Sequence, residues 1–258
     1  MVKKRLIPKL LIKSYNFNKE KKLILVSSKK FKDYRIVGDP VSQARIFQSQ
    51  KADELIVLFI DNNVKHREKN YKNLIQKFSS ETFMPLSIGG SVKSVSDFEF
   101  LLSNGADKVI INSVVYKNIN IIKKASKIFG SQCVVVSIDF IQNKKDFFLI
   151  NKNKKFKVNI NDYIKKLIDL GAGEIMLTDI ERDGTNKGLN NKAAKIISEK
   201  SSIPIIFSGG CSVANDFIEC FIKTKVSAIA AGNFFCFKDQ NPLQTRSQIL
   251  NSGINIRI

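Results

Sequence analysis

The segment Met84-Pro85-Leu86-Ser87-Ile88-Gly89-Gly90-Ser91 returns later in the chain as Ile203-Pro204-Ile205-Ile206-Phe207-Ser208-Gly209-Gly210. The two prolines lie 119 residues apart, and the pair Asp97-Phe98 returns at the same offset as Asp216-Phe217. Solenoid and propeller repeats run to roughly 20–50 residues, so this period is too long for a repeat of that kind. The sequence therefore predicts two similar halves, each with a strand that ends in a glycine-rich turn.

Short apolar runs alternate with amphipathic stretches along the whole chain. The runs are typical of buried parallel strands and cover Arg5–Ile12, Glu54–Ile60, Met84–Ile88, Lys108–Ile111, Cys133–Ile138, Glu174–Thr178, Ile203–Phe207 and Val226–Ala231. The predicted helices between them include Val41–Gln50, Val95–Ser103, Val158–Leu170 and Ala193–Lys200. This alternation indicates an α/β fold, a (βα)8 TIM barrel with an internal half-barrel duplication. We expect one domain over residues 1–258, with half-barrels of about 1–130 and 131–258, and a mobile loop at Ser14–Val37.

The charge and the apolar runs limit the classes of partner. The chain has 43 Lys and Arg residues against 23 Asp and Glu residues, a formal net charge of +20. The lysines are spread over the whole length without an arginine-rich tract or interleaved aromatic residues, so we expect no nucleic-acid partner. Attraction of anionic substrates accounts for part of the charge. The sequence has no long apolar run and no signal-peptide pattern at its start, so we expect a cytoplasmic protein without a membrane span.

Cysteine and histidine usage argues against several kinds of site. The cysteines, Cys133, Cys211, Cys220 and Cys236, form no C-x-x-C pair, and three of them lie in apolar stretches. That placement favours small buried side chains. The single histidine, His66, lies in a charged segment and is predicted to be a solvated helix position. We therefore expect no Ser-His-Asp triad, no metal and no cofactor.

Glycine-rich turns follow the third and seventh predicted strands. In a (βα)8 barrel the active site lies at this carboxyl end of the strands, and backbone N–H groups of such turns bind anions. We predict two phosphate sites on opposite sides of the mouth, formed by Gly89, Gly90, Ser91, Asn112, Ser113, Ser208, Gly209, Gly210, Gly232 and Asn233. The alternative is that these segments are only tight turns. Their presence at equivalent places in both halves favours phosphate binding.

Acidic residues lie at the same end of the barrel. Asp139 ends the fifth predicted strand, so its side chain is a candidate general acid or base at the mouth. The loop after the sixth strand carries Asp183, Gly184 and Thr185, which we predict to contact substrate. For Asp183 and Thr185, hydrogen bonds that only cap the loop are an equally good explanation.

Charged residues begin four of the strands at the opposite end. Arg5, Glu54, Lys108 and Glu174 are predicted to face one another across the bottom of the barrel. Buried charges must pair, because each unpaired one costs several kcal/mol. They form either a plug that stabilises the barrel or a gate between its interior and a partner.

Taken together, these features resemble the cyclase subunit of imidazole glycerol phosphate synthase, the HisF family, over essentially the whole chain. The matching stretches include Lys4–Pro8, Gly38–Val41, Ala52–Leu55, Gly105–Val109, Gly130–Gln132, Val134–Asp139, Gly171–Ile175, Glu181–Thr185 and Ser208–Gly210. The related isomerase of the same pathway shares the duplicated barrel but is less similar, since it lacks the Gly-Ser-Gln stretch.

The resemblance implies a partner and a reaction. A glutaminase subunit of the HisH type docks at the bottom of the family's barrel, and its ammonia crosses the barrel to a ribonucleotide with two phosphates. The four charged residues match the family's gate, the glycine-rich turns match its phosphate-binding regions, and Asp139 matches one of its two catalytic aspartates.

The chain departs from the family pattern at the mouth. The family's first strand reads Cys-Leu-Asp-Val where this chain has Lys9-Leu10-Leu11-Ile12, so Leu11 replaces the second catalytic aspartate. Phe59 replaces an aspartate, Ser27 a lysine and Ser91 a glycine. We therefore expect a specialised synthase subunit like the paralogues of surface-polysaccharide biosynthesis. The histidine-pathway cyclase, and a non-catalytic scaffold that conducts ammonia or stabilises a glutaminase, are the alternatives.

Overall fold

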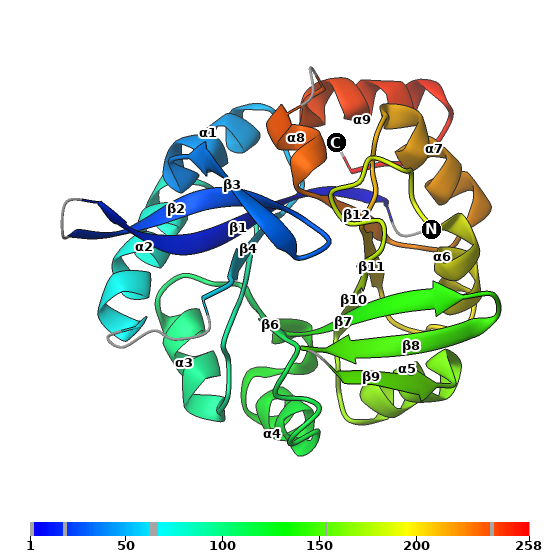
Figure 1. Ribbon diagram of the computed structural model, residues 1–258, viewed down its shortest axis with the longest axis horizontal. Coiled ribbons are helices and arrows are strands. Elements are labelled where there is room, and N and C mark those ends of the chain that lie inside the picture. The colour runs from blue at the N-terminus through cyan, green and yellow to red at the C-terminus, as the bar shows by residue number, and fades with distance from the viewer. Residues whose placement is uncertain (1–2, 18–19, 62–66, 153, 238–239, 258) are drawn as a thin grey trace.

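The structure, a computed structural model, describes residues 3–17, 20–61, 67–152, 154–237 and 240–257. In this part of the chain eight parallel strands form a closed barrel, and the helices surround it (Figure 1). The barrel strands, in order around the barrel, are β1 (Arg5–Phe17), β4 (Leu55–Phe59), β5 (Leu86–Gly89), β6 (Lys108–Ile111), β7 (Val134–Asn143), β10 (Glu174–Asp179), β11 (Ile205–Ser208) and β12 (Ala228–Ala231). Strand β12 pairs with β1, which closes the ring and confirms the expected TIM barrel.

The helices follow the strands as predicted. They are α1 (Pro40–Ser49), α2 (Arg67–Glu81), α3 (Val95–Ser103), α4 (Asn120–Phe129), α5 (Ile160–Asp169), α6 (Asn191–Ser198), α7 (Ala214–Lys223), α8 (Asn233–Phe237) and α9 (Pro242–Asn251). A short 3-10 turn, Ser131–Cys133, precedes β7.

The repeated Asp-Phe pair has the same structural role in both halves. The Asp97 carboxylate accepts hydrogen bonds from the backbone N–H groups of Lys93 and Ser94 at the start of α3. Asp216 does the same at the start of α7, and both following phenylalanines are fully buried. A carboxylate that satisfies otherwise unpaired N–H groups fixes where a helix begins.

Two apolar layers hold the barrel together. The larger core lies between the strands and the surrounding helices. A smaller cluster of buried side chains fills the barrel interior: Ile7, Ile56, Ile110, Val135, Met176, Ile206, Ala228 and Ala230. Alternate residues of a strand point to opposite faces, so each barrel strand contributes to both layers.

The prediction of a loop at Ser14–Val37 is wrong, because its described residues form strands joined by a tight turn. Strand β1 continues to Phe17 and pairs with β2 (Glu20–Lys29), which pairs in turn with β3 (Lys32–Gly38). A two-residue turn joins β2 to β3, and its residues Lys30 and Phe31 both have positive φ angles, 53° and 60°. Such a turn is usually marked by Asn-Gly, and Lys-Phe gives no such signal.

A second hairpin, which the sequence did not indicate, extends the fifth barrel strand. Strand β7 runs past Asp139 to Asn143 and pairs with β8 (Asp146–Asn151), which pairs with β9 (Lys154–Val158). Asp139 therefore lies within its strand, not at its end. Helix α5 begins after this hairpin, at Ile160. Because β1 and β7 open the two halves of the barrel, the two hairpins occupy equivalent positions.

The cysteines lie in apolar surroundings or partly at the surface. Cys211 and Cys220 are buried, Cys133 and Cys236 are partly buried, and all four are free thiols. His66 lies outside the described residues. No helix in the described ranges has both the length and the apolar character that crossing a membrane requires.

Candidate active site

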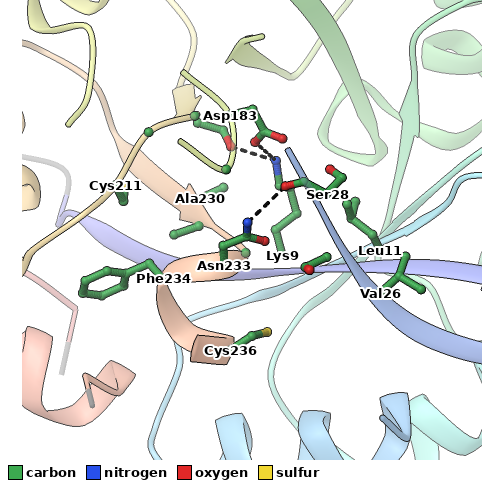
Figure 2. Close-up of a pocket in the computed structure, with 17 residues that line it drawn as sticks. Lys9, Leu11, Val26, Ser28, Asp183, Cys211, Ala230, Asn233, Phe234 and Cys236 are labelled. Atoms are coloured by element: carbon green, nitrogen blue, oxygen red, sulfur yellow. Dashed lines mark hydrogen bonds and ion pairs between the residues drawn. The ribbon is translucent and has the colours of Figure 1, made fainter. Parts of the chain in front are cut away.

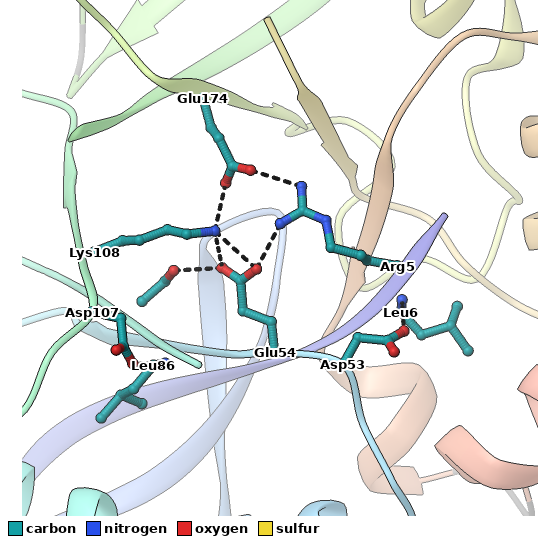
Figure 3. A network of polar contacts seen from close by, with 9 residues as sticks. Arg5, Leu6, Asp53, Glu54, Leu86, Asp107, Lys108 and Glu174 are labelled. Atoms are coloured by element: carbon teal, nitrogen blue, oxygen red, sulfur yellow. Dashed lines mark hydrogen bonds and ion pairs between the residues drawn. The ribbon is translucent and has the colours of Figure 1, made fainter. Parts of the chain in front are cut away.

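The four charged residues predicted at the bottom form one network across the barrel (Figure 3). The Arg5 guanidinium donates to Glu54 at 2.7 Å and to Glu174 at 2.8 Å. Lys108 Nζ lies 3.1 Å from Glu54 Oε2 and 3.0 Å from Glu174 Oε2. The hydroxyl of Ser87 donates a further hydrogen bond of 2.6 Å to Glu54. Each of the two carboxylates therefore forms ion pairs with both Arg5 and Lys108.

The network is shielded from water. The Glu54 side chain is 2% exposed, whereas that of Lys108 is 18% exposed and is the most accessible of the four. Burial lowers the pKa of Arg5, but Glu174 and Glu54 outweigh that effect and raise it above its ordinary value. Arg5 is therefore charged at neutral pH, and the network sets two basic side chains against two acidic ones.

The apolar interior layer lies above this network. On β1 the inward side chains are Arg5, Ile7, Lys9 and Leu11, so one strand crosses from the charged network through the apolar layer to the mouth. The eight residues of that layer carry no polar side-chain atoms that could hold water, apart from the weakly polar sulfur of Met176. A small neutral molecule meets a lower barrier in such a layer than an ion does.

A pocket lies at the mouth on the side of β11 and β12 (Figure 2). Its empty volume is about 490 Å³, a figure that includes space open to solvent. Seven predicted phosphate-site residues line it: Asp183, Gly184, Ser208, Gly209, Gly210, Gly232 and Asn233. Gly209 and Gly210 have φ angles of 105° and 106°, a conformation that favours glycine.

The β2–β3 hairpin covers this pocket. The backbone N–H of Lys30 donates to the carbonyl of Asp183 at 2.9 Å, and Asn233 Nδ2 donates to the carbonyl of Ser28 at 3.0 Å. A Cβ atom at Gly184 would lie 2.1 Å from the carbonyl oxygen of Ser28, so only glycine permits this contact. Val26, Ser27 and Ser28 complete the lining.

The other predicted phosphate-site residues lie elsewhere. Gly89, Gly90, Ser91, Asn112, Ser113 and Thr185 do not line this pocket. Gly90 nevertheless matches Gly209, since each turn presses against the end of the preceding barrel strand: a Cβ at Gly90 would lie 2.1 Å from the carbonyl of Phe59. Ser113 is exposed, and Thr185 Oγ1 donates to the carbonyl of Arg182 at 2.7 Å. The hydroxyl of Thr185 therefore makes the loop-capping hydrogen bond that was the alternative to substrate contact.

Asp139 projects from β7 into the mouth and is held by Asn112. The Nδ2 of Asn112 donates to Asp139 Oδ2 at 2.7 Å. Burial raises the pKa of Asp139 to about 7, although the Asn112 hydrogen bond and the charge of Lys9 act in the opposite direction. The nearby carboxylate of Asp183 adds to the rise. A carboxyl group with this pKa can both accept and donate a proton near neutral pH.

Of the departures from the family pattern, Leu11 does lie in the mouth and lines the pocket. Phe59 does not. It is 3% exposed and stacks on Tyr71 of α2, with ring centroids 3.9 Å apart, so its side chain belongs to the outer core. Asp61 does not take over the missing acid, because its carboxylate accepts a hydrogen bond from the backbone of Ser14.

Lys9 was not among the site residues predicted from the sequence. Its Nζ lies 3.1 Å from Ser208 Oγ and 3.3 Å from Asp183 Oδ1, and the side chain is 4% exposed. The available signal was its spacing: Lys9 stands four residues after Arg5 and two before Leu11, so all three share the inward face of β1.

Known proteins resemble the chain over its full length. The model of the histidine biosynthesis protein family matches residues 7–241. A protein of Prochlorococcus marinus, provisionally named imidazole glycerol phosphate synthase subunit hisF2, is 36% identical over 100% of this chain and 99% of its own length. The HisF subunits of imidazole glycerol phosphate synthase from Flavobacterium johnsoniae and Methanocaldococcus jannaschii are 35% and 34% identical, each over 100% of both chains. The chain belongs to the HisF family.

Membership in the HisF family confirms the resemblance drawn from the sequence motifs. The identities of 34–36% extend over the whole barrel, so both ends of it fall within the match. The specialised paralogue remains a hypothesis that depends on Leu11 and its neighbours.

Proposed function

We propose that this chain is the synthase (cyclase) subunit of a glutamine amidotransferase complex. A HisH-type glutaminase would dock at the bottom of the barrel and release ammonia there. The ammonia would cross the barrel interior and react at the mouth with a phosphorylated small molecule. In the HisF family this is the imidazole glycerol phosphate synthase reaction of histidine biosynthesis, a lyase-type cyclisation.

The observation that carries the proposal is the order of three layers along one barrel. A charged network of Arg5, Glu54, Lys108 and Glu174 lies at one end, a layer of buried apolar side chains follows, and a pocket with glycine-rich turns lies at the other end. Ammonia is small and neutral, so it can enter the apolar layer, whereas ammonium and water are disfavoured there. Movement of Lys108, the most exposed member of the network, would open the entrance.

At the mouth, Asp139 is the candidate general acid or base, oriented by Asn112. We propose that one phosphate of the substrate binds the pocket formed by Ser208, Gly209, Gly210, Gly232 and Asn233. The second phosphate would bind the equivalent turn of the first half at Gly89, Gly90 and Ser91, near Asn112 and Ser113. Leu11 can neither accept a proton nor position ammonia, so we expect an altered or weakened cyclisation step.

One assay tests the proposal. Purified protein is supplied with ammonium and the ribonucleotide substrate of the family, and product formation is compared with that of Leu11→Asp. We expect slow turnover by the natural chain and an increase of on the order of 10²-fold in the variant. Fast turnover by the natural chain would contradict the specialisation. Absence of turnover in both proteins would contradict cyclisation of the family's ribonucleotide by this chain.

A second candidate function is favoured by Leu11 itself. A pocket that lacks one of two catalytic carboxylates fits a scaffold that conducts ammonia or stabilises a glutaminase, for amidination of a nucleotide sugar in polysaccharide biosynthesis. Copurification with a glutaminase, together with glutaminase activation that survives Asp139→Asn, would support this role. Loss of glutaminase activation in that variant would favour the synthase.

We place the complex in the cytoplasm. Four free thiols, two of them partly exposed, are typical of a reducing compartment, where disulfides rarely form.

A further inference from the structure

Lys9 is a charged side chain in a place where charge is costly. It lies on the inward face of β1, directly above the apolar layer, with 4% of its side chain exposed. A buried ammonium group costs several kcal/mol unless it is paired. Two of its three donors are directed at Ser208 Oγ and Asp183 Oδ1, at 3.1 Å and 3.3 Å. Both partners line the pocket at the mouth.

Carboxylates near the pocket oppose the binding of an anion. Among its lining residues Asp183 contributes a carboxylate, and Asp139 lies close enough for its pKa to respond to both Asp183 and Lys9. Two carboxylates at the entrance would repel a phosphate group. Lys9 neutralises one of them and leaves the backbone N–H groups of the glycine-rich turns to act on the ligand.

Lys9 and Leu11 are the two inward residues of β1 near the mouth, and both line the pocket. Lys9 brings a positive charge to this lining, whereas Leu11 brings an apolar side chain.

We propose that Lys9 is an anion-binding specificity residue of this chain, which holds a phosphate group of the substrate in the pocket between Ser208 and the Gly232-Asn233 turn. A compact ammonium group is well suited to this role, since it acts as a point charge toward phosphate oxygens. The inference rests on the proposed function, because it assigns a ligand contact within the phosphate pocket proposed above.

The same position gives Lys9 an effect on Asp139. Its charge is one of the influences that lower the pKa of that carboxyl group. Removal of Lys9 should therefore also raise the pKa of Asp139 above about 7.

The test is a calorimetric titration of inorganic phosphate into the full-length protein. Lys9→Met removes the charge with little change in shape, and Lys123→Met removes the same charge from an exposed position on α4. We expect Lys9→Met to weaken phosphate binding on the order of 10-fold, and Lys123→Met to change it less than 2-fold. Asp183→Asn frees Lys9 from its carboxylate partner and should strengthen binding, an effect of opposite sign that does not require the Lys9 variant to fold.

The possible results distinguish the role of Lys9 from the existence of the phosphate pocket. If the natural chain binds phosphate and neither Lys9→Met nor Asp183→Asn changes the affinity, the role of Lys9 is overturned while the phosphate pocket stands. If the natural chain binds no phosphate, the pocket fails and the role of Lys9 fails with it. A carboxyl pKa for Asp139 that stays unchanged in Lys9→Met, followed by NMR, would contradict the placement of the Lys9 charge beside Asp139 at the mouth, on which the proposal depends.

Discussion

The Nδ2 atom of Asn112 lies 2.7 Å from Oδ2 of Asp139, so the strand-end amide of the first half fixes the catalytic candidate of the second. The hydrogen bond favours the ionised carboxylate, whereas burial opposes ionisation and raises the pKa to about 7. If Asp139 is a general base, kcat/KM should rise as pH increases through about 7. The measurement is the pH profile of turnover at constant free ammonia, since the ammonia concentration itself depends on pH.

Asn112→Leu should move that profile. Loss of the hydrogen bond removes an influence that lowers the pKa of Asp139, so the rising limb should shift to higher pH. A limb that stays in place would show that the titration belongs to another group.

Asp139 should destabilise the fold at alkaline pH. Its pKa is about 7 in the folded chain and about 3.8 in an unfolded one, so between these values the folded state binds more protons. Stability therefore falls as pH rises through that window. Asp139→Asn should be more stable than the natural chain at pH 8, by at least about 1 kcal/mol, and equally stable near pH 4.

The measurement is thermal unfolding at both pH values, with Asp169→Asn, at an exposed position of α5, as the control. A stability gain of equal size at both pH values would contradict the prediction, because it would not come from the titration of Asp139.

The charged network at the bottom should tolerate the loss of a carboxylate poorly. Glu54 is 2% exposed and contacts both Arg5 and Lys108. Glu54→Gln leaves two partly buried cations with one carboxylate and should cost about 3–5 kcal/mol of unfolding free energy. The control is Glu81→Gln, since Glu81 pairs with Arg45 at the same distance of 2.7 Å but on the surface, where the expected loss is about 0–1 kcal/mol.

Urea denaturation of both variants gives the comparison. Similar losses for Glu54→Gln and Glu81→Gln would show that the network is hydrated in solution, and would weaken its assignment as a closed gate.

The glycine-rich turn of the first half should be intolerant of any side chain. Gly90 has a φ angle of 116°, and a Cβ atom there would lie 2.1 Å from the carbonyl oxygen of Phe59. Gly253 also has a positive φ, 78°, but nothing lies within 4 Å of its Cβ position. Gly253→Ala should cost about 1 kcal/mol from backbone strain alone, and Gly90→Ala at least about 2 kcal/mol more.

Chemical denaturation measures both glycine variants, and the difference between them reports the steric contact at Gly90 together with the greater backbone strain at a φ of 116° than at 78°. Equal losses would mean that the turn moves away from β4 without cost.

The order of strands and helices and the duplicated turns were predictable from the sequence. Buried parallel strands read as apolar runs, and a period near 119 residues identified the two halves. The four charges at strand starts were also predictable as a group, because parallel strands begin at the same end of a barrel. The outward position of Phe59 was also predictable from the sequence. Alternate side chains of a strand point to opposite faces, so an inward Glu54 places the side chain five residues later on the outer face.

The sequence by itself determined which residue types lie at each end of the barrel, because alternation along a strand and the shared direction of parallel strands are local properties of the chain. Only the tertiary structure decided which of those residues meet. The two hairpins depend on pairing across turns without a glycine signal, and the pocket depends on β2 and β3 lying over β11 and β12. The contact of Lys9 with Asp183 joins residues 174 positions apart, a pairing that only closure of the barrel brings about.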